Sequence, residues 1–199
     1  MVDPKPDLSE RGTDFKPYPF DRVTRHATPG SVIATGKYPT VSGLEHDELG
    51  HPSGSPAVHT KMIAKRREKI KALGESLEIP EIFGDAEGDV LVVGWCSTWG
   101  PIKEAVGRLR SGGLKAGQLH IRHINPLPPG LDAIFSRYKH VVVVEINDEG
   151  LYGYGQLATL LRARYAMPSI VSYTKTDGLT FKISEIVSGV TKKIGATIA

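Results

Sequence analysis

Two histidines and three carboxylates lie within seven residues near the start of the chain. The stretch reads Glu45-His-Asp-Glu-Leu-Gly-His51, and imidazole and carboxylate groups at short spacing are common ligands of divalent metals. The zinc-protease pattern, however, needs His-Glu and a second histidine four residues later on one helix face. Here Asp47 follows His46, the second histidine comes five residues later, and a glycine and a proline flank it. The pattern favours a polar loop, or a loop that is hydrogen-bonded against a partner, over a metal site.

A glycine-rich turn offers a second chemical possibility. Gly153-Tyr-Gly-Gln-Leu-Ala158 has the G-x-G-x-x-A spacing of a dinucleotide-binding turn, and Asp177 follows 24 residues after the first glycine. Two observations count against it: the approach from the preceding strand is too long, and the unit is the third strand–helix unit of its domain. Dinucleotide binding therefore stays the weakest alternative.

The chain has one cysteine, Cys96, in the loop Gly94-Trp-Cys-Ser-Thr-Trp-Gly100. A thiol near a helix amino terminus can have a lowered pKa and act as a nucleophile. The more common case is a small side chain packed at a strand end, and we predict that case here. A single cysteine also excludes an internal disulfide, a cysteine zinc site and an iron–sulfur cluster held by this chain alone. The loop lacks the lysine of a phosphate-binding Walker loop.

Positive charge is concentrated in one segment. The whole chain has a net charge of +3, whereas residues 59–71 contain six Lys and Arg residues against Glu68, a net of +5. The rest of the chain is close to neutral, and the segment has no aromatic residue for base stacking. We therefore expect no nucleic-acid partner, and interpret the segment as a solvated helix face or a contact for an acidic patch on a companion subunit.

Nothing in the sequence indicates a membrane protein. Hydrophobic residues make up 40% of the chain and charged residues 24%, as in ordinary globular proteins. The longest aliphatic run, Val141–Val144, is far shorter than the roughly 20 residues of a spanning helix. The first residues contain no apolar stretch typical of a secretion signal. We predict a cytoplasmic protein with no membrane contact.

The elements that would position these groups change character along the chain. Residues 1–57 hold eight of the 14 prolines and predict an extended arm with one short strand at Ser31–Thr35. Apolar residues at helical spacing predict a helix from Ala57 to Leu77, and residues 58–88 are assigned to this basic helix and a linker.

An α/β domain is predicted over residues 89–199. Apolar or alternating runs indicate strands at 89–94, 118–122, 141–146 and 169–173. Helical patterns separate and follow them at 102–110, 131–137, 156–165 and 183–193. Alternation of this kind predicts an α/β fold of three layers, with a mostly parallel sheet between two layers of helices.

Several segments in this order resemble the carboxy-terminal part of the alpha subunit of 2-oxoacid:ferredoxin oxidoreductases, in particular the 2-oxoglutarate type. They cover most of the chain, from about residue 14 to residue 190. The segments are Thr40-Val-Ser-Gly-Leu-Glu-His-Asp-Glu-Leu-Gly-His-Pro52, Lys65-Arg-Arg-Glu-Lys-Ile-Lys71, Gly94–Gly100, Val141-Val-Val-Val-Glu-Ile-Asn147, Gly155-Gln-Leu-Ala158, Lys175-Thr-Asp-Gly178 and Phe181-Lys-Ile-Ser-Glu185.

The resemblance implies a transketolase-carboxy-terminal-like domain at residues 89–199 and an arm that trails from a pyrimidine-binding domain. It also implies participation in oxidative decarboxylation of a 2-oxoacid to an acyl-coenzyme A. Thiamine diphosphate, magnesium and an iron–sulfur cluster act in such holoenzymes, and we expect other chains to hold them, with none bound by this chain alone. The implied partners are a beta subunit and the missing alpha-subunit domains, with ferredoxin and coenzyme A at the level of the complex.

The chain lacks most of the alpha subunit, so no catalytic, cofactor-binding or metal-binding residue is transferred to it. We predict instead that part of the acidic segment lies at a domain or subunit interface: Glu45, His46, Asp47 and His51. The alternative function is a non-catalytic assembly module left by a split or truncated gene. A neighbouring reading frame for the missing domains would favour the enzyme subunit.

Overall fold

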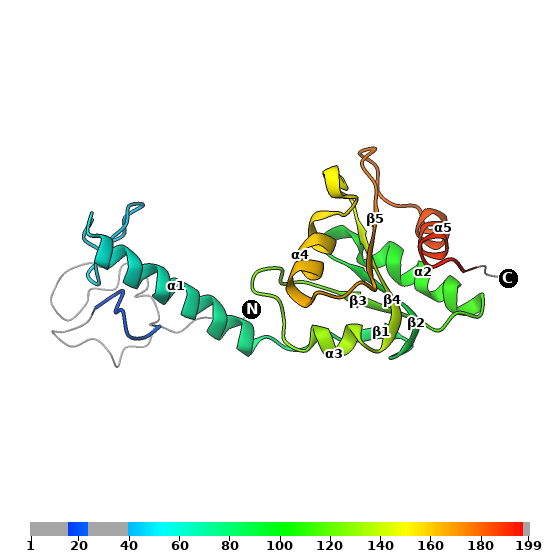
Figure 1. Cartoon of the computed structure of the whole chain (residues 1–199), viewed down its shortest axis with the longest axis horizontal. Coiled ribbons are helices and arrows are strands. Elements are labelled where there is room, and N and C mark those ends of the chain that lie inside the picture. Colours follow the sequence, from blue (N-terminus) through cyan, green and yellow to red (C-terminus); the bar gives the residue numbers. More distant parts are fainter. Residues whose placement is uncertain (1–15, 24–39, 197–199) are drawn as a thin grey trace. The chain divides into compact units, whose positions relative to one another are not determined.

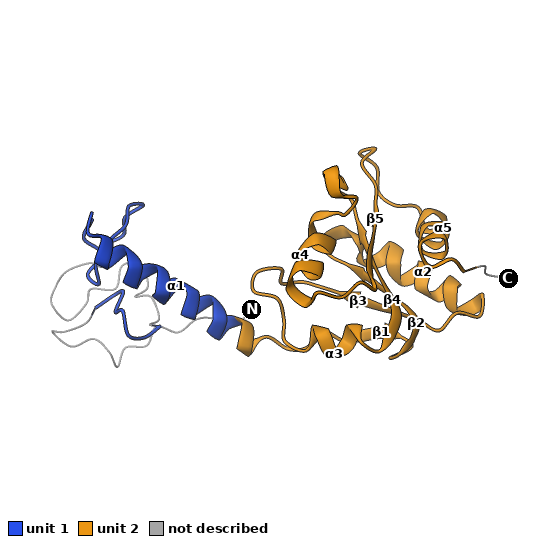
Figure 2. Ribbon diagram, in the orientation of Figure 1, with its two compact units in different colours: residues 1–73 blue, residues 74–199 orange. Residues whose placement is uncertain are grey.

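The computed structural model describes residues 16–23 and 40–196 (Figure 1). The strand expected at Ser31–Thr35 lies outside the described residues. The chain divides into two compact units, residues 1–73 and 74–199 (Figure 2). The division falls inside the helix α1 (Pro56–Ser76), whereas the sequence predicted boundaries after residues 57 and 88. Those predicted domain boundaries stay a prediction.

Helix α1 is the main element of the first unit, and its bounds agree with the helix predicted at Ala57–Leu77. It buries one side chain completely, that of Met62, which is 1% exposed. Other apolar residues of the helix, such as Ile63 and Ile70, remain partly exposed. The first unit therefore depends on polar contacts between α1 and the segments before it more than on a large apolar core.

The second unit is built on a five-stranded sheet in the order β1-β3-β2-β4-β5. Four strands are parallel to one another: β2 (Gly88–Gly94), β3 (Ala116–His120), β4 (Tyr138–Glu145) and β5 (Ile170–Thr174). Strand β1 (Ile82–Gly84) pairs antiparallel with β3 at one edge. The sequence predicted only a linker there, because three residues are too few to show a strand period.

Helices cover both faces of the sheet, which confirms the predicted three-layer fold (Figure 1). One face packs against α3 (Leu131–Phe135) and α4 (Gln156–Tyr165), and the other against α2 (Trp99–Ser111) and α5 (Ile183–Ile194). Two short 3-10 turns follow strands β2 and β4, η1 (Cys96–Thr98) and η2 (Gly150–Tyr152).

The valine-rich strands explain why both faces must be covered. In β2, Leu91 and Val93 enter one core cluster while Val90 and Val92 enter the other, and all four are fully buried. Strand β4 repeats this alternation from Val141 to Val144. Each such side chain contributes about 1.5–3 kcal/mol when it is removed from water. The central strands therefore fix the frame from which the loops project.

Candidate functional site

The acidic segment forms a tight turn closed by its own backbone. The N–H of Ser53 donates to the carbonyl of Glu45, and the N–H of Asp47 donates to the carbonyl of His51, both at 2.9 Å. The Asp47 carboxylate accepts two further backbone N–H groups inside the turn, at 2.9 Å each. Asp47 therefore stabilises the turn in the manner of an Asx turn, and its carboxylate is engaged within the segment.

Glu45 joins this turn to helix α1. Its carboxylate receives two hydrogen bonds from the Arg66 guanidinium, at 2.6 and 3.1 Å, and one from His59 Nδ1 at 2.6 Å. The backbone N–H of His46 adds a fourth at 3.1 Å. The Arg66 guanidinium lowers the pKa of Glu45 to about 2, against the opposite effect of burial, and the hydrogen bond from His59 lowers it further. Glu45 is therefore ionised throughout the neutral pH range, and its carboxylate is engaged in hydrogen bonds within the first unit.

The segment 16–22 packs on the outer side of the same turn. Lys16 Nζ binds the carboxylate of Glu48 at 2.8 Å, and the backbone N–H of Phe20 donates to the other oxygen of that carboxylate at 3.1 Å. The N–H of Tyr18 donates to the carbonyl of Glu48 at 3.0 Å. The rings of Tyr18 and His46 lie with their centroids 4.3 Å apart. Two segments separated by more than 20 residues thus form one folded piece.

Basic side chains of α1 hold this piece in place. Lys65 Nζ donates to the carbonyls of Pro19 at 2.5 Å and Arg22 at 2.6 Å. Lys61 Nζ lies 5.2 Å from the centroid of the Phe20 ring, within the range of a cation–π contact. The sequence left two interpretations of the basic segment open, a solvated helix face and a contact for a companion subunit. The structure shows a third, because several of its basic side chains bind segments of the same unit.

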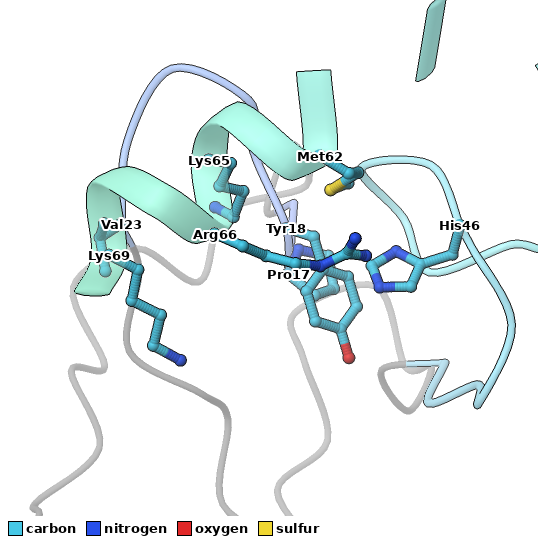
Figure 3. A pocket seen from close by; sticks show the side chains of 8 residues that line it. All are labelled: Pro17, Tyr18, Val23, His46, Met62, Lys65, Arg66 and Lys69. Carbon is cyan, nitrogen blue, oxygen red and sulfur yellow. The ribbon is translucent and has the colours of Figure 1, made fainter. Parts of the chain in front are cut away.

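A small pocket remains where α1 faces the segment 16–23 (Figure 3). Its volume is about 160 Å³. The lining residues are Pro17, Tyr18, Val23, His46, Met62, Lys65, Arg66 and Lys69. Figure 3 shows the Arg66 guanidinium reaching toward the ring of His46. One of the four predicted interface residues, His46, therefore lies in the same pocket as three cationic side chains of the basic segment.

In the second unit, the loops after β2 and β4 lie at the point where the chain order of the strands reverses. Ligands of open α/β sheets usually bind outside the carboxyl ends of the strands at such a point. The loop after β2 is closed by Thr98, whose hydroxyl donates to the carbonyl of Trp95 at 2.8 Å. Cys96 is exposed and has a φ of +51°. The prediction of a buried, packed Cys96 is wrong, because the left-handed turn directs its side chain outward.

The glycine-rich turn before α4 is explained by a buried carboxylate. Glu145, fully buried at the end of β4, accepts the backbone N–H groups of Leu157 and Ala158 at 2.9 Å each. A Cβ on Gly155 would lie 2.4 Å from Glu145 Oε1, so only glycine fits there. These N–H groups are the ones that a bound pyrophosphate would need. The structure gives the dinucleotide hypothesis no support at this turn.

Lys175 connects the last two family-like segments. Its ammonium binds Glu185 Oε2 at 2.7 Å and the carbonyl of Thr180 at 3.2 Å, with Asp177 at 3.4 Å. Glu185 also accepts the backbone N–H of Lys182 at the start of α5, at 2.8 Å. The Glu185 carboxylate raises the pKa of Lys175. This lysine therefore fixes the loop between β5 and α5.

The donor chemistry of the described residues does not fit a resident metal or cluster. Across residues 16–23 and 40–196, no group of three or more His, Cys, Asp or Glu side chains could hold a metal ion. An iron–sulfur cluster is usually held by four cysteine thiolates, and this chain has one cysteine. Within the described part of the chain, no helix is both long and apolar enough to span a bilayer.

The structure brings the four predicted interface residues into one turn, but it gives them different surroundings. Glu45 has a side chain only 19% exposed, whereas that of His51 is 63% exposed. Sequence reasoning missed two partners of Glu45, His59 and Arg66. The sequence did contain a signal for this contact. His59 and Arg66 are seven residues apart in the predicted helix, and side chains at that spacing lie on one helix face, two turns apart.

Comparison with known proteins gives a consistent result. Residues 88–186 match the family model described as pyruvate:ferredoxin oxidoreductase core domain II. The chain is 36% identical over 184 residues to 2-oxoglutarate oxidoreductase subunit KorA of Mycobacterium tuberculosis, covering 90% of this chain and 26% of that protein. It is 34% identical over 193 residues to the alpha subunit of 2-oxoacid:ferredoxin oxidoreductase 2 of Aeropyrum pernix, covering 94% of this chain and 28% of that one.

A solved structure agrees with these relatives. It is the 2-oxoglutarate:ferredoxin oxidoreductase of Magnetococcus marinus, with 2-oxoglutarate, coenzyme A and succinyl-CoA bound. The two chains are 33% identical with a TM-score of 0.71, over 86% of this chain and 29% of that one. The chain therefore spans less than a third of the length of each of these three proteins.

Proposed function

The chain belongs to the 2-oxoacid:ferredoxin oxidoreductase family as a part of an alpha subunit, and we propose that it serves as one component of a cytoplasmic, thiamine diphosphate-dependent enzyme of this kind. In the proposed reaction a 2-oxoacid loses carbon dioxide, its acyl group passes to the thiol of coenzyme A, and the electron pair goes to ferredoxin. We propose 2-oxoglutarate as the substrate.

The observation that supports this proposal is the large share of this chain over which it is similar to the three relatives. It covers 86–94% of the chain in the three relatives and so extends over both units, while the family model matches residues 88–186. Two of the three relatives are named for 2-oxoglutarate. Thiamine diphosphate, magnesium and the iron–sulfur cluster would be held by companion chains, namely a beta subunit and the remaining alpha-subunit domains.

Within that complex, we propose that the turn at residues 45–53 is a contact surface for a companion chain. Glu45 and Asp47 are bonded internally, so they shape the turn and would leave contact to its exposed side chains. His51 is exposed, and so are Val41 and Leu44, which come just before the turn and are 84% and 68% exposed. An apolar and imidazole surface on a rigid turn is suited to partner binding, because little side-chain entropy is lost on contact.

The test is reconstitution. The chain would be co-expressed with the candidate companion chains, and 2-oxoglutarate- and coenzyme A-dependent reduction of ferredoxin or viologen would be measured with and without it. A reaction rate that does not depend on this chain would contradict the proposal. For the interface, His51→Ala should weaken co-purification of the companions, whereas His123→Ala, which removes an exposed histidine of the second unit, should not. Equal co-purification of both variants would contradict the interface.

A non-catalytic assembly module is the second candidate, and the short span of the chain favours it. The chain covers 26–29% of the relatives, which leaves most of an alpha subunit to be supplied elsewhere. The same reconstitution separates the two candidates. Stable co-purification without any effect on the rate would favour the module, and a rate that requires the chain would favour the enzyme component.

A further inference from the structure

The pocket in the first unit has an unusual charge balance. Three of its eight lining residues carry permanent positive charge and none is acidic (Figure 3). A surface pocket with cations on its wall attracts anions, and more strongly where its walls exclude water. The question is whether nearby carboxylates already neutralise these cations.

The carboxylates of the surrounding turn are engaged elsewhere. Glu45 is paired with Arg66 and His59, and Glu48 is paired with Lys16. Glu45 therefore neutralises Arg66, and its carboxylate is engaged in that pair. This leaves the two lysines of the wall to be accounted for.

Those lysines are four residues apart on α1 and have no carboxylate partner among the described residues. The Lys65 ammonium donates to two backbone carbonyls, which are neutral. Lys69 has no hydrogen bond or ion pair to any residue in the described part of the chain. Partial burial and then the charge of Lys69 lower the pKa of Lys65, and the opposite effects of Asp21 and Glu48 are smaller. Among the described residues, the wall of the pocket therefore has two lysines that form no ion pair with a carboxylate.

The rest of the wall is apolar or aromatic and limits the size of a ligand. Tyr18 and Met62 contribute a ring and a buried thioether side chain, and Val23 lies at the rim with 47% exposure. A volume of 160 Å³ corresponds to roughly five water molecules at about 30 Å³ each. Only a compact group fits, such as one phosphate or a short carboxylate.

We propose that this pocket is a binding site for a small oxyanion, a phosphate or carboxylate group, held by Lys65 and Lys69 against Tyr18 and Met62. The site does not depend on the proposed oxidoreductase function, because every element of it lies within the first unit of this chain. It also assigns a role to the part of the basic segment that the turn does not use.

The test is calorimetric titration of the full chain at low ionic strength with inorganic phosphate and, separately, with succinate. We expect saturable one-site binding of at least one anion, weakened about tenfold in Lys69→Gln, because the variant loses one charge-assisted hydrogen bond to the anion. Arg67→Gln is the matched control. It removes the same charge from an exposed position of the same helix that does not line the pocket, and should change affinity less than about twofold.

A second variant separates a shaped site from a general basic surface. Val23→Phe places a larger side chain at the rim and leaves the charge unchanged, so it should reduce affinity if the pocket holds the anion. The helical circular dichroism of each variant checks its folding. Absence of saturable binding by both anions, or equal weakening by Lys69→Gln and Arg67→Gln, would overturn the proposal. Neither result would bear on reconstituted oxidoreductase activity, which is measured separately.

Discussion

The buried carboxylate of Glu145 allows a quantitative test of how the glycine-rich turn is held. Glu145→Gln keeps the size of the side chain but replaces one acceptor oxygen by an NH₂ group. Leu157 and Ala158 each donate one backbone N–H to the carboxylate at 2.9 Å. In the variant, one of these donors would face another donor and lose its partner. The first turn of α4 would also lose a nearby negative charge.

The size of the effect follows from these two losses. A hydrogen bond to a charged group contributes about 1.5–3 kcal/mol, and a carboxylate at a helix amino terminus adds about 0.3–1 kcal/mol. Because the variant no longer buries a charge, part of this loss is offset. We expect the free energy of unfolding to fall by about 2 kcal/mol. Glu149→Gln, on the exposed loop nearby, should change it by less than about 0.5 kcal/mol.

The measurement is urea unfolding followed by tryptophan fluorescence. The chain has two tryptophans, Trp95 and Trp99, and both lie in the second unit, so the signal reports on that unit alone. A Glu145→Gln variant as stable as Glu149→Gln would refute the reasoning. Gly155→Ala gives a further check, because its Cβ would lie 2.4 Å from Glu145 Oε1. It should destabilise the wild type by about 1–3 kcal/mol, and clearly less in a Glu145→Ala background.

Three further predictions concern other contacts. Gly189→Ala should lower the free energy of unfolding by about 1–3 kcal/mol, because its Cβ would overlap the ring of Tyr173 in β5. Gly107→Ala has open space around its Cβ and should instead raise the free energy of unfolding by up to about 1 kcal/mol. Equal urea midpoints for the two variants would contradict this. Since the pKa of Glu45 is lowered from its usual 4.5 to about 2, its contribution is complete above pH 4.5 and is lost as the pH falls toward 2. Protease cleavage of the first unit should accelerate over that range, and Glu45→Gln should be cleaved faster already at neutral pH; a Glu45→Gln pH profile identical to wild type would exclude this role. Lys175→Met should speed amide hydrogen exchange between β5 and α5, and Lys139→Met, which removes an exposed ion pair, should leave exchange there unchanged.

Much of the second unit could be predicted from the sequence. The runs at 89–94 and 141–146 are apolar at every or nearly every position, and such strands are stable only when both faces are covered. That requirement already indicates helices on two sides of a parallel sheet. The edge strand β1 was not predicted, because it is three residues long and is defined by its pairing with β3 rather than by a sequence pattern of its own.

The candidate sites show where local patterns stop being informative. The spacing around Gly153 and Gly155 is that of a nucleotide-binding turn, yet the space beside Gly155 is filled by a carboxylate from the end of β4. The same spacing serves a ligand or an internal side chain, because in both cases glycine permits close approach to a helix amino terminus. Cys96 likewise reads as a small packed residue until the backbone direction of its turn is known.

The sequence by itself determined the composition of this protein's parts: a valine-rich α/β frame, an acidic turn and a basic helix. Periodicity and residue type are local properties, so they suffice for that. Only the tertiary structure decided which charges meet, since Glu45 pairs with Arg66 across 21 residues and Lys65 reaches carbonyls more than 40 residues away. Ion pairs and hydrogen bonds act over a few ångströms, and distances of that kind are set by the fold and not by separation along the chain.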